Sequence, residues 1–444
     1  MTDQLPVGPY RMVRTAEGTA VPWYVVPFDA DGACTGPRTR DDLVARARGG
    51  GFTDIVIFCH GWNNDWRQAT GRYDDFFNGY VRLRTERALP VAPDYAPLLV
   101  AIFWPSKLLV ADADQPPDFA GDEPDDARVG DERADLAELA AVVDPDDRSR
   151  LFELAQQRSL DEADALELAG ILAPLYATDR EETAEQAPPT PAEIAASWQA
   201  PRQRRSADPA DFDTAPTTVD GAPHAAGWPD FLRPREILRG ASVWLMKDRA
   251  GRVGARGVGP LLVQLLGTGA RVHVVGHSFG AKVLLSAIAA PAALPAPVHS
   301  ALLLEPAVSH LCFAADADGH GHPGGYRAVL DRVGQPILST YSAHDEPLTK
   351  FFHLALRRAG DLGEADIAAD EPPSRYAALG GFGPRPLGAQ AALTPILDPT
   401  TRYALTAPGL QVVGVDGTRA IPSHGEISNP STWWMLYDLM TRAG

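Results

Sequence analysis

The segment from residue 271 to residue 282, RVHVVGHSFGAK, constrains the fold of this chain more than any other stretch. It starts as a β-branched, apolar run typical of a buried strand, and it continues into small and apolar residues that favour a helix. Between the two lies a turn of five residues, Gly-His-Ser-Phe-Gly. Because so tight a turn brings the strand and helix backbones together, Gly276 and Gly280 are favoured there. The segment predicts an α/β fold in which Ser278 projects from a sharp strand-to-helix turn.

Short apolar runs alternate with helical patterns on both sides of this segment, as in α/β proteins. The expected strands are residues 21–28, 54–59, 98–104, 272–275, 300–304, 336–341 and 410–415. The expected helices are residues 40–48, 281–290, 348–358 and 432–442. Because the last strands are continuously apolar, we expect a mostly parallel central sheet covered by helices on both faces.

The acidic residues are concentrated in one part of the chain. The formal net charge is -18, and residues 112–185 hold 23 of the 58 acidic residues but 6 of the 40 basic ones. Helix-period segments at 132–143 and 149–172 lie among acidic and Pro-rich stretches. We interpret residues 112–234 as an acidic, Pro/Ala-rich insertion, a cap or lid, within a single domain (1–444) whose core is formed by 1–111 and 235–444. A separate domain also fits this pattern.

Composition excludes several classes of function. A net negative charge offers no basic surface for phosphates, so no nucleic-acid partner is expected. The first residues lack the apolar core of a secretory signal, and no run approaches the ~18 apolar residues of a membrane span. We therefore expect no membrane span and a cytoplasmic location. The three cysteines have neither the number nor the spacing of a disulfide framework or a zinc site.

One loop, residues 315–325, carries side chains that can bind metals: Asp316, Asp318, His320 and His322. Their spacing fits neither a calcium-binding EF loop nor a zinc-binding helix, so we favour a loop without metal. Neither a metal nor a cofactor is expected.

Ser278 needs a base to act as a nucleophile, usually a histidine that a carboxylate holds in its working tautomer. In folds of this kind the acid and then the histidine follow the serine along the chain, each after a later strand. Asp345 follows the strand 336–341, and His424 follows the last strand. Glu305, at the end of the strand 300–304, remains an alternative acid.

Other neighbours of this candidate triad are interpreted differently. Glu346 is expected to be solvated, and His344 could replace His424 only if the chain-order rule failed. His277 is expected to point away from the serine and to pack or hydrogen-bond locally.

The serine also needs two amide donors for a developing oxyanion. Phe279, at the start of the helix, provides one, because helix N-termini favour negative charge. The loop after strand 54–59, which begins His60-Gly61-Trp62, provides a place for the second, and we choose the N–H of Trp62. Gly61 is expected to permit the turn, and His60 is expected to be structural.

These residues together resemble the α/β-hydrolase superfamily, over roughly residues 20–111 and 240–444. Within it, HGWNN, MKDRAGRVGARGV (246–258) and GHSFGAK are similar to a poorly characterised group of bacterial and fungal serine-esterase-like hydrolases. The resemblance implies that Ser278 is the nucleophile, His424 the base and Asp345 the orienting acid, with Trp62 and Phe279 as oxyanion donors. In one respect the chain departs from the superfamily: lids there usually follow the strand after the nucleophile helix, whereas the longest insertion here precedes the nucleophile.

The expected function is that of a serine hydrolase that cleaves a small-molecule acyl ester through an acyl-enzyme. The same triad also serves acyltransferases and amide or lactone hydrolases. A non-catalytic interaction protein on a hydrolase scaffold is a third hypothesis, and the acidic insertion is either a solvated cap or a surface for a protein partner. Several aromatic residues line the mouth of the site or belong to the core: Trp62, Trp66, Phe76, Phe77 and Phe279.

Overall fold

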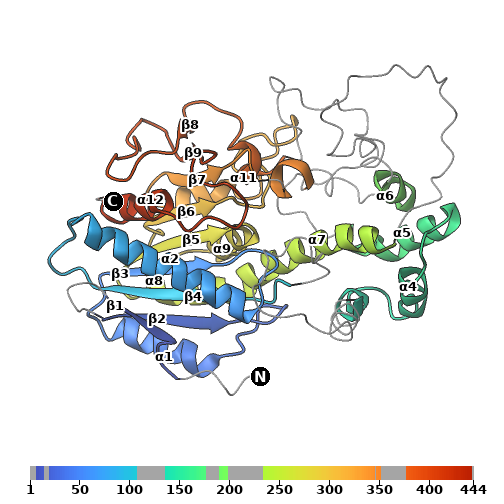
Figure 1. Ribbon diagram of the computed structural model, residues 1–444, viewed down its shortest axis with the longest axis horizontal. Coiled ribbons are helices and arrows are strands. Elements are labelled where there is room, and N and C mark those ends of the chain that lie inside the picture. The colour runs from blue at the N-terminus through green and yellow to red at the C-terminus, as the bar shows by residue number, and fades with distance from the viewer. Residues whose placement is uncertain are drawn as a thin grey trace, which may run out of the picture.

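A computed structural model describes residues 7–14, 20–107, 136–176, 190–198, 234–345, 347–351 and 377–442. Its centre is a nine-stranded sheet with the order β1-β2-β4-β3-β5-β6-β7-β9-β8 (Figure 1). All neighbouring strands are parallel except the antiparallel pair β1 and β2. The strands are β1 (Arg11–Arg14), β2 (Ala20–Pro27), β3 (Asp54–Cys59), β4 (Pro97–Phe103), β5 (Arg271–His277), β6 (Ser300–Leu304), β7 (Ile337–Tyr341), β8 (Ala391–Pro395) and β9 (Val412–Asp416).

This sheet confirms the prediction of a mostly parallel α/β fold. Strands β3 and β6 have the predicted bounds, and the other predicted strands are found within three residues of theirs. The two strands that were not predicted, β1 and β8, lie at the edges of the sheet. Both have exposed positions along their length, so neither forms the continuous apolar run by which the central strands are recognised.

Helices cover both faces of the sheet. The helices are α1 (Pro37–Arg48), α2 (Trp66–Glu86), α4 (Arg148–Ala155), α5 (Glu162–Tyr176), α6 (Pro191–Ser197), α7 (Pro234–Arg252), α8 (Gly259–Leu266), α9 (Phe279–Ala289), α11 (Leu379–Phe382) and α12 (Pro430–Met440). Two π-helical turns, η4 (Val253–Val258) and η6 (Pro347–Phe351), and one 3-10 turn, η5 (Arg327–Arg332), complete them.

Alternate residues of the central strands face the two helical layers, as the pleat of a strand requires. Ile55 and Ile57 of β3 join the apolar core formed with α1, α7, α8 and α9. Val56 and Phe58 join the core formed with α2 and α12. Both cores are continuous along the sheet, so its carboxyl edge is held rigidly from two sides.

Helix α2 was not predicted, although its start carries a clear signal. Asp65 and Gln68 form a capping box there, with the Asp65 side chain accepting from the Gln68 amide. Gly71 and Gly79 lower the helix propensity of the segment. Gly79 is required by packing, because a Cβ at this position would overlap the Trp433 ring of α12.

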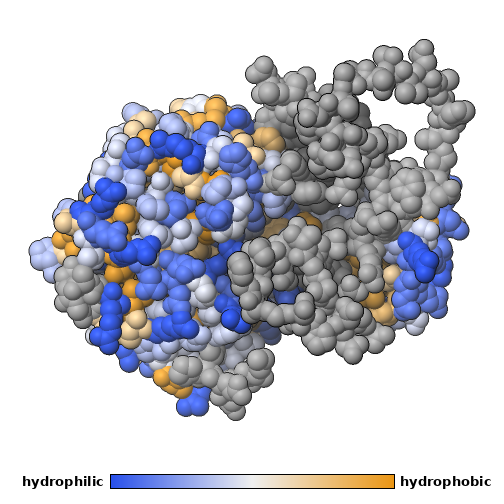
Figure 2. Space-filling view, viewed as in Figure 1, coloured by the Kyte–Doolittle hydropathy of each residue, from blue (hydrophilic) through white to orange (hydrophobic). Residues whose placement is uncertain are grey.

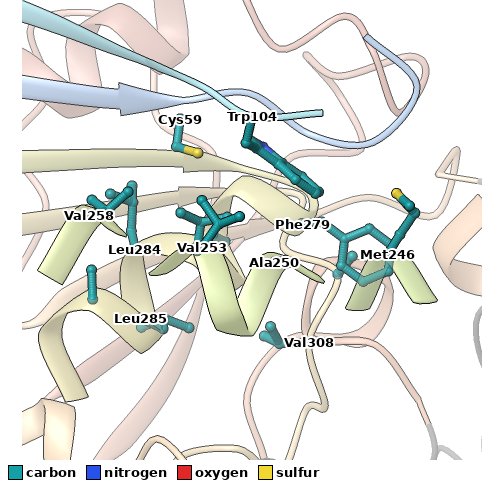
Figure 3. Close-up of a cluster of buried hydrophobic side chains, with 14 of the residues drawn as sticks. Cys59, Trp104, Met246, Ala250, Val253, Val258, Phe279, Leu284, Leu285 and Val308 are labelled. Carbon is teal, nitrogen blue, oxygen red and sulfur yellow. The ribbon is translucent and has the colours of Figure 1, made fainter. Parts of the chain in front are cut away.

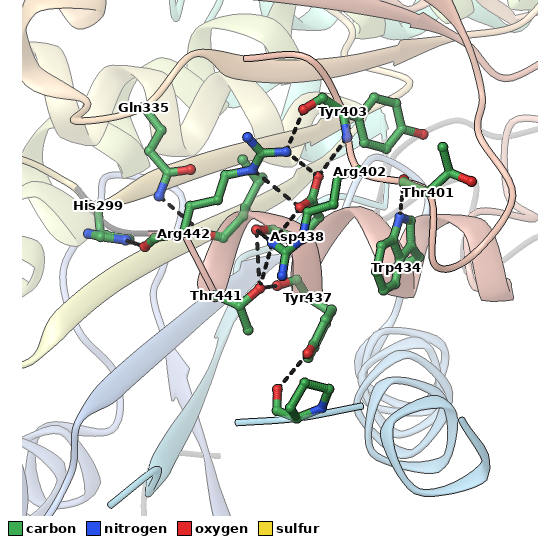
Figure 4. Close-up of polar contacts among 12 residues, drawn as sticks. His299, Gln335, Thr401, Arg402, Tyr403, Trp434, Tyr437, Asp438, Thr441 and Arg442 are labelled. Atoms are coloured by element: carbon green, nitrogen blue, oxygen red, sulfur yellow. Dashed lines mark hydrogen bonds and ion pairs between the residues drawn. The ribbon is translucent and has the colours of Figure 1, made fainter. Parts of the chain in front are cut away.

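A buried ionic cluster fixes α12 to the loop before β9 (Figure 4). The fully buried Asp438 carboxylate accepts from Arg402 at 2.8 Å, from Arg442 at 2.7 Å and from the Tyr403 amide at 3.0 Å. At the other end of the helix, Asn429 caps the first turn. The loop between β9 and α12, which carries His424, is thereby anchored at its helical end.

The described chain between β4 and β5 contributes the helices α4 to α8, and α7 runs from the sheet toward α4 and α5 (Figure 1). A single helix over 149–172 was predicted, but the segment forms two helices that end and begin at Ala155 and Glu162. The Asp161 side chain accepts from the Asp164 amide and so starts the second helix. Arg150 joins the two helices by ion pairs with Asp164 and Glu167.

The surface of these helices is mainly hydrophilic where Figure 2 displays it. Of the predicted helix 132–143, residues 136–141 are helical. Residues 108–135, 177–189 and 199–233, with 14 of the 23 acidic residues of the acidic block, lie outside the described residues. The predicted helix 348–358 is described to Phe351, where it is π-helical. No helix in the described part of the chain is long and apolar enough to cross a membrane.

Candidate active site

The site lies at the point where the strand order of the sheet reverses. The chain passes from β3 to β4 on one side, whereas β5 pairs with the other side of β3. In open parallel sheets, ligands bind outside the carboxyl ends of strands at such a switch point. The loops after β3 and β5 carry Trp62 and Ser278, two of the residues predicted for the site.

Ser278 occupies the predicted turn between β5 and α9, with φ 54° and ψ -126°. A residue other than glycine rarely adopts a positive φ, and such strain persists only where neighbouring groups impose it. Here the Ser278 amide donates to the Leu304 carbonyl at 3.0 Å, and its carbonyl accepts from the amides of Ala281 at 3.1 Å and Ala307 at 3.2 Å. Both backbone polar groups of the serine are therefore fixed.

Three glycines let the backbones approach around the serine. A Cβ at Gly276 would lie 2.6 Å from the Ala281 Cα, and one at Gly280 would overlap the backbone of β3 at Cys59. A Cβ at Gly61 would lie 2.5 Å from the Ser278 Cβ. Gly61 was expected for its turn, yet it is not among the glycines of positive φ. Its role is the close approach of its loop to the serine.

The predicted triad residues meet at this point. His424 Nε2 lies 2.8 Å from Ser278 Oγ, and His424 Nδ1 lies 2.6 Å from Asp345 Oδ2. The other Asp345 oxygen accepts from the Leu348 amide at 2.9 Å. Asp345 is fully buried, whereas the His424 side chain is 22% exposed. The histidine thus joins a buried carboxylate to the serine and is the member of the three that reaches solvent.

His277 has a role that the sequence did not reveal. Its ring Nε2–H donates to the His424 carbonyl at 2.7 Å, and the two rings lie 5.0 Å apart. Burial lowers the pKa of His277 well below its usual value, and the neighbouring His424 lowers it further. A neutral His277 therefore holds the backbone of the residue that contacts the serine. It packs locally, as expected, but toward the triad rather than away from it.

A hydrogen-bonded chain joins the loop after β3 to the His424 loop. Asn64 Oδ1 accepts from Arg72 Nε at 2.7 Å, and Arg72 Nη1 donates to the Gly425 carbonyl at 2.8 Å. Arg72 lies on α2 and is separated from Gly425 by most of the chain. No local motif could have indicated this link, because it depends on how α2 packs.

The peptide between Gly61 and Trp62 is held by its carbonyl. The Gly61 carbonyl accepts from His60 Nδ1–H at 2.8 Å and from Asn64 Nδ2 at 3.1 Å. In a trans peptide the N–H points opposite to the C=O, so the Trp62 amide points away from His60 and Asn64. Within the described residues, neither the Trp62 amide nor the Phe279 amide has an acceptor. Both amides predicted as oxyanion donors are thus unoccupied.

His60 is structural, as predicted. Its ring is buried and stacks on the Trp104 ring at 5.8 Å. Burial lowers the pKa of His60 to about 4. In the neutral tautomer that the Gly61 carbonyl selects, Nε2 accepts from the Trp104 amide at 3.3 Å.

The alternative residues occupy other places. Asp345, and not Glu305, is hydrogen-bonded to His424, and His344 is exposed. Glu346 lies outside the described residues. His322 pairs with Asp318 within an exposed loop, and no group of ligands suited to a metal ion occurs among the residues described.

The aromatic residues divide between core and site. Phe76 and Phe77 are buried in the core under α2, and Trp66 packs on Phe103. Trp62 is partly exposed and meets the buried Phe279 edge to face at 6.4 Å. Phe279 belongs to an apolar cluster that also includes these residues (Figure 3): Cys59, Trp104, Met246, Ala250, Val253 and Val308.

The segment 246–258, singled out in the sequence, packs against α9, the helix that follows Ser278. It forms the end of α7 and the π-helical turn η4, and a Cβ at Gly254 would overlap the Val283 carbonyl of α9. Gly254 thus allows the close packing of η4 on α9, whereas a Cβ at Gly257 would overlap the Gly32 carbonyl and the Phe28 ring.

Comparisons with protein-family models, curated proteins and solved structures gave no match to this chain.

Proposed function

We propose that this protein is a serine hydrolase of the α/β-hydrolase type, which cleaves a carboxylic ester through an acyl-enzyme on Ser278. One observation carries the proposal: a serine in a strained strand-to-helix turn is hydrogen-bonded to His424, which is hydrogen-bonded to the buried Asp345. Two amides that have no acceptor among the described residues, those of Trp62 and Phe279, lie on the flanking backbone. Geometry of this kind defines the serine–histidine–acid triad on several unrelated folds.

In the acylation step, Ser278 Oγ attacks the ester carbonyl carbon as His424 Nε2 takes the hydroxyl proton. The carbonyl oxygen becomes an oxyanion, which accepts from the amides of Trp62 and Phe279. Asp345 stays ionised and stabilises the imidazolium through Nδ1–H. The imidazolium then gives its proton to the departing alkoxide, and the C–O bond to the alcohol breaks.

In the deacylation step, water attacks the acyl carbon and His424 takes one of its protons. The second tetrahedral intermediate uses the same two amides. It collapses with loss of Ser278 Oγ, which recovers its proton from His424. An alcohol or amine in place of this water would give acyl transfer, so product analysis with added alcohols and amines separates hydrolysis from transfer.

The acyl group of the substrate is proposed to pack on Trp62, whose ring lies edge to face with the buried Phe279. Trp62 is the half-buried member of this pair, and Phe279 is continuous with the apolar cluster of α7. Both residues also provide the proposed oxyanion donors. An apolar acyl or aryl group bound there would place its carbonyl oxygen at the two amides.

The test combines a fluorophosphonate probe with hydrolysis of short p-nitrophenyl esters. We expect Ser278→Ala to abolish labelling and to lower kcat at least ~10³-fold. Ser300→Ala is the matched control, because Ser300 Oγ also contacts a histidine, His273 Nδ1, at 2.8 Å. That variant should label and turn over like the wild type. Labelling of Ser278→Ala at the wild-type rate would refute the proposal.

A further inference from the structure

Glu305 lies directly beneath the candidate nucleophile. It follows β6, the strand next to β5. On one side of it the Leu304 carbonyl accepts from the Ser278 amide at 3.0 Å, and on the other the Ala307 amide donates to the Ser278 carbonyl at 3.2 Å. The turn that contains Glu305 therefore holds both backbone polar groups of Ser278.

The backbone of Glu305 is itself constrained. Its φ is 45°, in the left-handed region that residues other than glycine rarely adopt. Its amide donates to Thr340 Oγ1 at 2.9 Å, and a Cβ at Gly380 of α11 would overlap the Glu305 carbonyl carbon. Strain of this kind at an interior position is characteristic of functional sites. The side chain is consequently fixed in the protein interior, with no exposed surface.

The Glu305 carboxyl group is in an environment that does not suit an anion. Neither of its oxygens accepts a hydrogen bond of ordinary geometry among the residues described, and the side-chain donor that acts on it is the neutral Thr340 hydroxyl. The charged groups that act on it are Asp345, which follows β7, and Asp416, which ends β9, and both are acidic. Burial raises the pKa of Glu305 well above its usual value, and the Asp345 carboxylate raises it further.

Asp345 differs from Glu305 in the donors that it receives. Its two oxygens accept from His424 and from the Leu348 amide. When two buried carboxyl groups share a site, one of them keeps its proton. The proton belongs on Glu305, because Asp345 is the group that accepts two well-formed hydrogen bonds and is stabilised by them as an anion.

We propose that Glu305 is a positioning residue: as a neutral carboxylic acid, it donates a hydrogen bond to the Asp345 carboxylate and holds that carboxylate against His424. The inference rests on the proposed function, in which Asp345 orients the base. Loss of the Glu305 proton at alkaline pH would place two negative charges side by side in the interior. Activity should then fall on the alkaline side as Asp345 is displaced.

Two substitutions of similar size separate the donor from the charge. Glu305→Gln stays neutral at every pH and keeps an N–H that can donate to Asp345, whereas Glu305→Met removes the donor. We expect Glu305→Gln to keep kcat within about threefold of the wild type and to lose the alkaline decline. Glu305→Met should lower kcat about tenfold or more, with little change in KM. Wild-type kcat in Glu305→Met, or the same alkaline decline in Glu305→Gln, would overturn the positioning role.

Infrared difference spectroscopy tests the protonation itself and needs no turnover. The spectrum of the wild type minus Glu305→Gln at neutral pH should contain the C=O band of a protonated carboxyl group. The band should give way to carboxylate bands as pH rises. A carboxylate spectrum at neutral pH would refute the proposal even if Ser278 proves to be the nucleophile. Conversely, absence of Ser278 labelling would refute the proposed function and leave the infrared result to stand by itself.

Discussion

Gly61→Ala is the substitution that tests most directly how the loop after β3 serves the site. The added Cβ would lie 2.5 Å from the Ser278 Cβ, 3.0 Å from His277 Nδ1 and 3.1 Å from the His277 carbonyl oxygen. Carbon atoms in contact stand about 3.5–4.0 Å apart, so the loop must retreat by about 1 Å. The Trp62 amide belongs to the same loop and retreats with it.

The expected cost follows from the proposed role of that amide as an oxyanion donor. Removing one oxyanion donor lowers kcat by ~10²–10³-fold, or about 2.7–4 kcal/mol, and a 1 Å misplacement of a catalytic group costs ~10²-fold. We therefore expect kcat of Gly61→Ala on a p-nitrophenyl ester to fall by about 10²-fold. KM should change much less, because the donor acts on the transition state.

Gly71→Ala is the control for this experiment. Gly71 lies in α2, and a Cβ there would meet no atom within 4 Å. This variant should keep wild-type kcat and gain up to ~1 kcal/mol of stability, because alanine favours a helix over glycine. If Gly61→Ala unfolds like the wild type and also keeps wild-type kcat, then the loop after β3 contributes no donor and the reasoning is wrong.

Two further predictions concern stability. Burial lowers the pKa of His273 to about 4, from 6.5, so the unfolded chain binds a proton over a pH range in which the folded protein does not. The free energy of unfolding should fall by up to about 3 kcal/mol as pH drops from about 6.5 to about 4. Urea titrations at several pH values would measure how steeply the free energy of unfolding depends on pH in the wild type and in His273→Asn. The same pH dependence in both proteins would contradict the prediction. Asp438→Ala should cost about 2 kcal/mol, because it removes the buried acceptor of Arg442, of the half-exposed Arg402 and of the Tyr403 amide (Figure 4). An unchanged thermal midpoint would show that the cluster is not stabilising.

The parts of the site that depend on local backbone geometry could be predicted from the sequence. A β-branched run, a turn bounded by glycines and an apolar helix are contiguous, so Ser278 could be placed from its neighbours alone. Asp345 and His424 were placed by chain order, because parallel strands bring the loops after their carboxyl ends to one edge of the sheet. These are statements about short segments and about topology, and both can be made without knowledge of packing.

The residues that sequence reasoning missed depend on tertiary contacts. Arg72 lies on α2, a helix that was not predicted because its internal glycines lower the helix propensity of the segment. Its guanidinium donates to the Gly425 carbonyl, which is far along the chain. His277 was expected to point away from the serine and to hydrogen-bond locally, but its ring donates to the carbonyl of His424, a residue far along the chain. The hydrogen-bond partner of neither residue can be predicted from its local sequence.

The chain contains a second serine–histidine–aspartate arrangement, and comparing the two shows what a triad requires. His273 lies 2.8 Å from Ser300 Oγ and 3.0 Å from Asp54 Oδ1, distances like those of the candidate site. Ser300 and Asp54 begin β6 and β3, so this cluster lies at the amino edge of the sheet, and all three residues are buried. Ser300 is followed by a strand rather than by a helix N-terminus, and it lacks the positive φ of Ser278. The same three side chains at similar distances therefore serve to satisfy buried polar groups at one edge. At the other edge, the serine has a strained backbone and precedes a helix N-terminus, and in the proposed mechanism this is where amides receive the oxyanion.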